Sequence, residues 1–152
     1  MVAALDPESG EELWLVDPES YRTGPPIQTN IMIRGIEYWT DGYIERIFVA
    51  TLGKQLLSID AKTGKLDLNF GDDGFIDLSQ NLGRFEFESQ FITAGAAPIA
   101  VGNSLIVGSK IFDYGMYNRS PPGHVRAYDT YTGELKWRFN TIPQEGEEFT
   151  NT

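Results

Sequence analysis

A short motif that occurs three times does most to limit how this chain of 152 residues can fold. In each copy a Gly follows an Asp by four residues, a Ser or Thr precedes that Gly, and a large apolar residue follows the Asp by eight. The copies lie at residues 4–14, 58–68 and 127–137. Repetition of this kind indicates similar supersecondary units, each of which buries its apolar face only against a neighbouring unit.

Each copy of the motif predicts a β-hairpin. The residues before the Asp are strand-like, as in 55–59 and 124–128, and an Asp side chain can accept hydrogen bonds from the backbone of the turn that follows it. Gly supplies the positive φ that a hairpin loop with a bulge needs. We therefore expect the motif to build a scaffold without doing chemistry, with Trp14 and Trp137 joining neighbouring units.

The rest of the chain completes four-stranded units. Asp41-Gly42 is a hairpin turn signal between two apolar segments. We expect strands at 31–39, 44–52, 55–60 and 65–70, and again at 90–93, 99–101, 104–111 and 124–128. Residues 71–74 indicate a turn, and residues 76–82 either a short helix or an irregular segment. The predicted fold class is all-β, a partial β-propeller of four-stranded antiparallel blades.

We assign the whole chain to one propeller domain. Residues 1–17 form the end of a blade, 31–70 a full blade, and 90–142 a full blade with an insertion at 112–122. The sequence starts inside a repeat and holds too few blades to close a ring, which leaves open sheet edges. We therefore expect a fragment of a larger protein that is poorly stable alone.

Composition excludes some classes of function. The formal net charge is −10 and the 12 basic residues are scattered, which argues against nucleic acid or an anionic membrane as a partner. The absence of Cys excludes disulfides and thiol chemistry. No signal peptide or transmembrane run is visible in the sequence.

Two further segments carry a family resemblance. Residues 33–39 read Ile-Arg-Gly-Ile-Glu-Tyr-Trp, and residues 121–129 read Pro-Pro-Gly-His-Val-Arg-Ala-Tyr-Asp. With the repeat, they resemble the pyrroloquinoline quinone (PQQ)-dependent dehydrogenases, in particular the membrane glucose dehydrogenase-like branch, whose propeller has eight blades. The resemblance implies oxidation of a sugar or alcohol, PQQ and Ca²⁺ as cofactors, and a membrane quinone or cytochrome as electron acceptor. It also implies a periplasmic protein or one on the periplasmic face of the inner membrane.

The resemblance implies roles for a few residues. Arg34 would bind a carboxylate of the quinone, for which a guanidinium fork is suited; the alternative is a surface arginine at a strand end. Thr93 and Ser109 would place hydroxyl groups near the quinone, although Gly95 stands where the family pattern has a Thr.

Asp113 would be a Ca²⁺ ligand, with Asn118 behind it, since hard cations prefer carboxylate and amide oxygens. An exposed loop Asp is the alternative. The family's catalytic base, an Asp of a later blade, is expected outside this chain. We interpret the single histidine, His124, as structural.

Two other functions compete with the enzyme. A non-catalytic propeller with the same repeats, of the outer-membrane assembly type, would offer a protein-binding surface. A sugar-binding or WD-type module is a third possibility, but the chain has no Gly-His…Trp-Asp pattern. Arg34-Gly35 and the insertion at 112–122 favour the enzyme.

Overall fold

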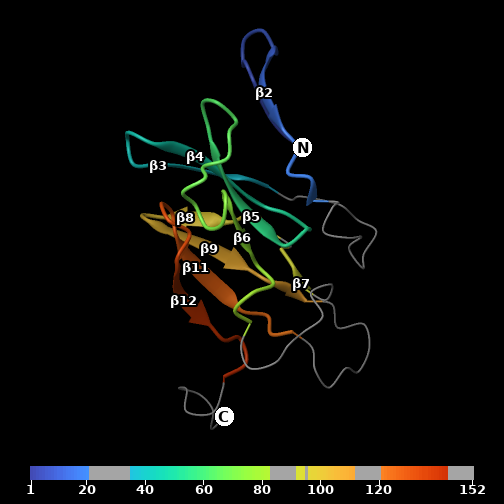
Figure 1. Ribbon diagram of the computed structural model, residues 1–152, viewed down its shortest axis with the longest axis vertical. Helices are drawn as coiled ribbons and strands as arrows, with labels where there is room; N and C mark the ends of the chain where they lie inside the picture. The colour runs from blue at the N-terminus through green and yellow to red at the C-terminus, as the bar shows by residue number, and fades with distance from the viewer. Residues whose placement is uncertain (21–34, 83–91, 95, 112–120, 144–152) are drawn as a thin grey trace.

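A computed structural model of the chain describes residues 1–20, 35–82, 92–94, 96–111 and 121–143. The described residues form strands and turns without an α-helix (Figure 1), so the all-β prediction is confirmed. None of these residues belongs to a helix with the length and hydropathy of a membrane span.

An N-terminal hairpin comes first. Strand β1 (Val2–Leu5) pairs with β2 (Glu12–Val16), and their register shifts between Ala4 and Leu5, where the loop with its bulge was expected. This hairpin projects from one end of the molecule (Figure 1). It packs against the next sheet through an apolar cluster of Val2, Trp14, Val49, Leu57 and Ile59.

The β3–β6 blade is a four-stranded antiparallel sheet. Its strands are β3 (Glu37–Thr40), β4 (Glu45–Ala50), β5 (Gln55–Asp60) and β6 (Phe75–Asp77), in that spatial order. The expected strand at 65–70 is wrong, because only Leu66 makes a bridge, to Ile59, and the chain then leaves β5.

A tight turn at 71–74 accounts for that difference. Gly71, Asp73 and Gly74 all have positive φ, and the N–H of Gly74 donates to the carbonyl of Phe70 at 3.0 Å. The turn reverses the chain, so the outer strand forms one segment later, at β6. The helix considered for 76–82 is absent, and Ile76 lies within β6.

The β8–β12 blade is the second four-stranded sheet. It consists of β8 (Ile99–Val101), β9 (Ser104–Gly108), β11 (Val125–Asp129) and β12 (Leu135–Phe139). The strand expected at 104–111 is divided, because Ser109 separates β9 from β10 (Lys110–Ile111). β10 pairs with β7 (Ile92–Thr93) in a small sheet outside the blade.

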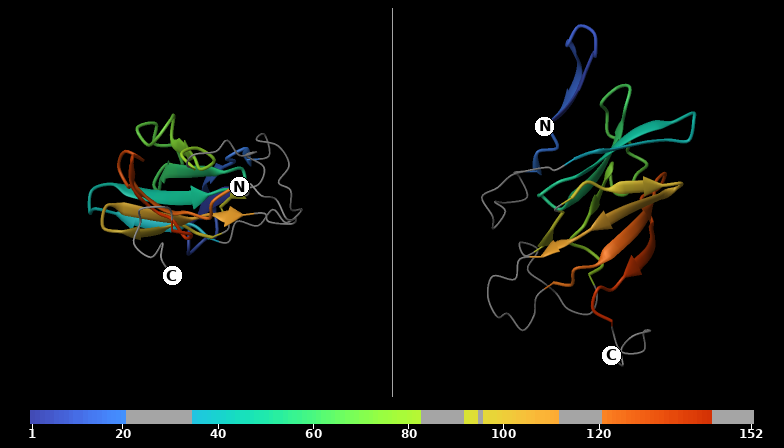
Figure 2. Two further views of the ribbon diagram at one scale, coloured as in Figure 1. Left: turned by 90° about the horizontal axis from the view of Figure 1, so that it is seen from below. Right: turned by 180° about the vertical axis from the view of Figure 1, so that it is seen from behind.

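The two blades pack face to face (Figure 2). Their shared core holds Trp39, Phe48, Ala50, Leu56, Phe70 and Leu78 from the first blade and its loops, and Ala94, Leu105, Val107 and Tyr128 from the second. The junction between these blades is therefore the central interface of the described chain.

The three motif turns share one geometry, as predicted. Gly10, Gly64 and Gly133 have φ of 73°, 72° and 75°. In each turn the Gly N–H donates to the carbonyl of the motif Asp at 2.8–2.9 Å. The side chains of Asp6, Asp60 and Asp129 accept backbone N–H bonds from the residues two and three positions later.

Candidate cofactor site

Trp14 docks the N-terminal hairpin on the turn of the next blade. Its indole Nε1 donates to the carbonyl of Ala61 at 3.0 Å. A Cβ built on Gly64 would lie 2.7 Å from Cδ2 of Trp14, so the ring rests directly on the glycine backbone. The predicted joining role of Trp14 is confirmed. Trp137 is 43% exposed and donates no such bond within the described part of the chain.

The first strands of the two blades lie side by side at the junction. The carboxylate of Glu37 accepts the N–H of Ala100 at 2.7 Å, and the indole of Trp39 donates to the carbonyl of Gly102 at 2.6 Å. A Cβ on Gly35 would lie 3.0 Å from Cβ of Ala97. The segment that enters β3 therefore lies against the segment that enters β8.

Of the two hydroxyl residues that the sequence singled out, Thr93 lies in β7 and Ser109 directly precedes β10. Thr93 is buried and pairs with Lys110, the residue after Ser109, so the structure brings Thr93 and Ser109 to neighbouring positions. The hydroxyl of Thr93 donates to the carbonyl of Leu52 at 3.0 Å. The hydroxyl of Ser109 donates to the carbonyl of His124 at 2.9 Å. Both protons are therefore engaged by the protein, whereas the oxygens retain acceptor capacity.

Arg34, Asp113 and Asn118 lie outside the described residues. Within the described ranges no group of three or more His, Asp or Glu side chains could hold a metal ion. Residues 71–74 form the turn that the sequence indicated.

A set of basic side chains that sequence reasoning missed fastens the segment 78–82. Arg126 is 1% exposed, and its guanidinium donates to the carbonyls of Leu78 at 2.8 Å and Gln80 at 3.1 Å. Arg138 donates to the carbonyl of Asn81 at 3.3 Å, and Nε2 of His124 donates to that of Leu82 at 3.1 Å. These bonds hold the segment that follows β6 on the β8–β12 blade, and they give the buried His124 a structural role.

Arg126 carries its charge in an apolar setting. Burial lowers the pKa of its guanidinium, an effect that interactions with Tyr128 and Asp77 partly oppose. No described carboxylate lies within ion-pair distance of it, so backbone carbonyls supply its compensation. The sequence did contain a signal for the buried role of Arg126. His124, Arg126 and Tyr128 alternate along the chain, and a basic residue on the buried side of a strand requires hydrogen-bond partners.

The family of the chain follows from comparison with known proteins. The family model for the β-propeller domain of PQQ glucose/ethanol/alcohol dehydrogenases matches residues 1–152. The chain belongs to this family. The repeat and the segments at 33–39 and 121–129 resemble the PQQ-dependent dehydrogenases, and the prediction made from that resemblance is confirmed.

Curated relatives include several PQQ dehydrogenases. The glycerol dehydrogenase large subunit of Gluconobacter oxydans is 29% identical over 91% of the chain, and this match covers 19% of the relative. Quinohemoprotein alcohol dehydrogenase ADH IIB of Pseudomonas putida is 33% identical over 93% of the chain and 18% of the relative. Quinoprotein glucose dehydrogenase A of Acinetobacter calcoaceticus is 27% identical over 97% and 21%. The chain thus spans about a fifth of the length of these relatives.

Solved structures agree on the fold. Quinohemoprotein alcohol dehydrogenase ADHIIG of Pseudomonas putida superposes with a TM-score of 0.64 at 29% identity, over 93% of the chain and 18% of that structure. The quinohemoprotein alcohol dehydrogenase of Comamonas testosteroni gives 0.67 at 24% identity, over 94% and 18%. The predicted propeller fold is therefore confirmed.

PQQ is the cofactor that this family implies. The described residues suit part of such a group, because two hydroxyl side chains, those of Thr93 and Ser109, lie at neighbouring backbone positions beside the blade junction. Neither of these two side chains carries the positive charge that would pair with a carboxylate of PQQ. Arg34, for which the sequence predicted that role, directly precedes Gly35 in the sequence and lies outside the described residues.

Proposed function

We propose that the chain is part of a quinoprotein dehydrogenase that oxidises a sugar or an alcohol with PQQ and passes the electrons to a membrane quinone or a cytochrome. The observation that carries the proposal is the family match over residues 1–152. The names of the relatives support the substrate class, since they include dehydrogenases of glycerol, alcohol and glucose. The same family supports a place in the periplasm or on the periplasmic face of the inner membrane.

PQQ, when bound, supplies the two-electron redox chemistry, and the protein binds and orients it. Arg34 is proposed to bind a carboxylate of the cofactor through a bidentate, charge-assisted contact. Thr93 and Ser109 are proposed to hydrogen-bond it. Because both hydroxyl protons are given to the carbonyls of Leu52 and His124, each side chain offers an oxygen acceptor unless its hydroxyl rotates.

Asp113 is proposed as a ligand of a Ca²⁺ ion at the same site. Carboxylate oxygens are the ligands that Ca²⁺ prefers, and the ion would act as a Lewis acid. In the sequence Asp113 follows Ser109 by four residues.

The test uses the protein expressed from its complete reading frame. It is titrated with PQQ in the presence of Ca²⁺, and dye reduction is measured with glucose, glycerol and simple alcohols. Arg34→Ala should weaken PQQ binding by about 2–5 kcal/mol because it leaves a desolvated carboxylate unpaired. Lys65→Ala, at an exposed position, is the matched loss of a basic side chain and should leave binding unchanged.

The outcomes separate the competing functions. Binding of PQQ with dye reduction supports the dehydrogenase. A complete protein that folds but binds no PQQ would overturn the proposal in favour of a non-catalytic propeller. Unchanged PQQ affinity in Arg34→Ala would remove Arg34 from the site.

A further inference from the structure

The second copy of the motif lacks the tryptophan that docks the first. Leu68 stands at that position and is 66% exposed. The chain leaves β5 after the bridge between Ile59 and Leu66, so residue 68 does not lie on an outer strand. The β3–β6 blade must therefore contact the β8–β12 blade by another device.

Arg46 of β4 occupies the equivalent place. Its guanidinium Nη1 donates to the carbonyls of Thr130 and Tyr131, the latter at 3.0 Å, and the residue is 7% exposed. Thr130 directly follows the motif Asp129, as Ala61 directly follows Asp60. Arg46 thus binds the same motif carbonyl at this junction that Trp14 binds at the previous one.

Asp67 and Tyr131 fix the guanidinium in place. The carboxylate of Asp67 forms an ion pair with Nη2 of Arg46, and only 15% of its side chain is exposed. The guanidinium carbon lies 5.8 Å from the ring centroid of Tyr131. That ring meets the indole of Trp39 edge-on, at 5.0 Å between centroids. A planar, bidentate cation suits this combination of carboxylate, carbonyl and aromatic partners.

Backbone fills the space that an indole would take. At the first junction Gly64 faces the ring of Trp14, whereas a Cβ on Gly133 would lie 2.8 Å from the backbone N of Gly71. The N–H of Gly71 donates to the carbonyl of Thr132 at 2.9 Å. The turn at 71–74, which displaces the outer strand, thus also closes the junction.

We propose that Arg46, held by Asp67, is the docking residue between the β3–β6 and β8–β12 blades, in the role that Trp14 has at the preceding junction. Because Thr93 bonds to Leu52 across the same junction, Arg46 is also a positioning residue for the cofactor site. This second part rests on the proposed function.

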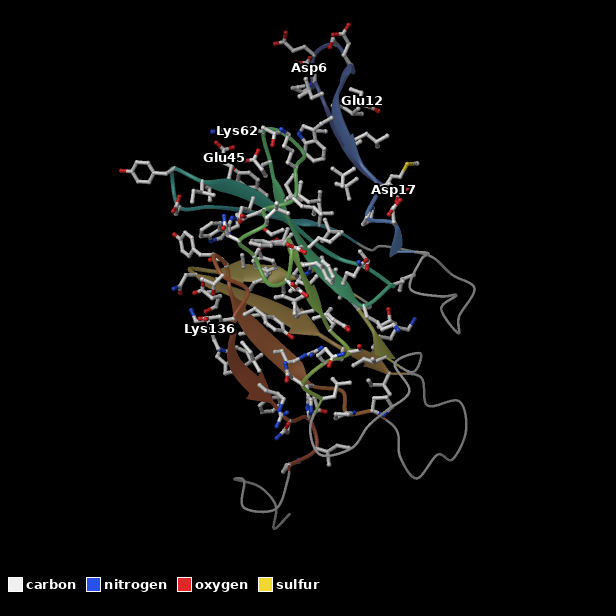
Figure 3. All side chains as sticks on the ribbon, viewed as in Figure 1. Asp6, Glu12, Asp17, Glu45, Lys62 and Lys136 are labelled. Carbon is white, nitrogen blue, oxygen red and sulfur yellow. The ribbon has the colours of Figure 1, made fainter. Side chains whose placement is uncertain are left out.

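The docking role is tested by unfolding the complete protein in urea. Arg46→Met leaves the Asp67 carboxylate unpaired and partly buried, and we expect a decrease of about 100-fold or more in the folding equilibrium constant. The double variant with Asp67→Asn should show a coupling of about tenfold. Lys62→Met, which breaks the exposed pair with Glu45 (Figure 3), is the matched control and should cost less than about fivefold.

A rescue experiment separates this device from the motif tryptophan. Leu68→Trp should not restore the stability of Arg46→Met, because residue 68 is exposed and displaced from the outer strand. Arg46→Lys should be intermediate in stability between Arg46→Met and the unaltered protein, since an ammonium cannot reproduce the planar fork of a guanidinium. Additive effects of Arg46→Met and Asp67→Asn, or full rescue by Leu68→Trp, would overturn the docking role.

The positioning role has its own readout. Arg46→Lys should weaken PQQ binding about tenfold under conditions where the protein is fully folded, because small displacements of binding groups are costly. Val2→Ala, which loosens the N-terminal hairpin instead, should leave PQQ affinity unchanged. Equal PQQ affinities for Arg46→Lys and Val2→Ala would overturn the positioning role. The docking role is decided separately by the unfolding measurements in urea. Loss of PQQ binding in the unaltered protein would overturn the positioning role together with the proposed function.

Discussion

The contact between Trp14 and Gly64 predicts a large cost for one added methyl group. In Gly64→Ala the new Cβ would lie 2.7 Å from Cδ2 of Trp14, closer than real contacts allow, on a backbone with φ of +72°. Gly10→Ala is the matched control, because Gly10 has φ of +73° and no heavy atom within 4 Å of a built Cβ. Both variants incur about 1–2 kcal/mol for left-handed backbone. Gly64→Ala alone adds an overpacking term of about 1–3 kcal/mol.

Urea unfolding followed by circular dichroism gives both free-energy changes. A second pair of measurements is made in a Trp14→Val background, where the ring is gone and the excess cost of Gly64→Ala over Gly10→Ala should disappear. An equal cost for the two glycine variants in the parent protein would show that the indole does not rest on Gly64. If Gly64→Ala still costs more unfolding free energy than Gly10→Ala in the Trp14→Val background, the docking explanation is refuted.

Three further predictions concern the blade junction and the turns. Trp39→Phe should cost about 1 kcal/mol in unfolding free energy, because it removes the indole bond to the carbonyl of Gly102 and keeps an aromatic ring. Arg126→Met should cost about 1–3 kcal/mol and speed amide hydrogen exchange at 79–82, because the buried carbonyl of Leu78 loses its donor; unchanged exchange would contradict this. The pKa of Asp60 is lowered by the hydroxyl and backbone donors of its turn. The contribution of the ionised Asp60 carboxylate to the free energy of unfolding is therefore complete above about pH 4. It is lost as the pH falls through the pKa of Asp60 in the folded protein. The urea midpoint should fall as the pH is lowered below about 4, and it should fall less in Asp60→Asn.

The sequence predicted the hairpins well because their determinants are local. An Asp, a Gly four residues later and flanking strand formers specify the turn without help from the rest of the fold. The three turns accordingly share φ values within a few degrees, at Gly10, Gly64 and Gly133. The all-β class followed from the same signals.

The outer strand of the β3–β6 blade could not be placed in this way. The motif suggested residues 65–70, by analogy with the strands after Gly10 and Gly133. Asp73 adopts φ of +51° between two glycines that also have positive φ, and this turn moves the strand to 75–77. Leu68 in place of a tryptophan and the turn signal at 71–74 were local signs of the change, but its consequence depends on a contact with a distant blade.

The candidate site was only partly accessible to sequence reasoning. Thr93 and Ser109 came from the family resemblance, and the structure brings them to neighbouring positions. Their hydroxyl partners, the carbonyls of Leu52 and His124, carry no sequence signature because every residue has a carbonyl. Arg46 reads as an ordinary strand residue, since burial of an arginine depends on acceptors that tertiary structure supplies.

At both junctions the hydrogen-bond acceptor is the backbone carbonyl of the residue after the motif Asp. This choice of acceptor affects how propellers of this type can evolve. A main-chain carbonyl survives every substitution that preserves the turn, so the acceptor atom on the receiving blade does not depend on the identity of a side chain. Mutation can then exchange the donor on the preceding blade, from an indole to a guanidinium, while the acceptor atom stays the same. Blades of this type should therefore tolerate duplication, shuffling and divergence one at a time, and a single chain can hold junctions of different chemistry, as the junctions made by Trp14 and Arg46 show.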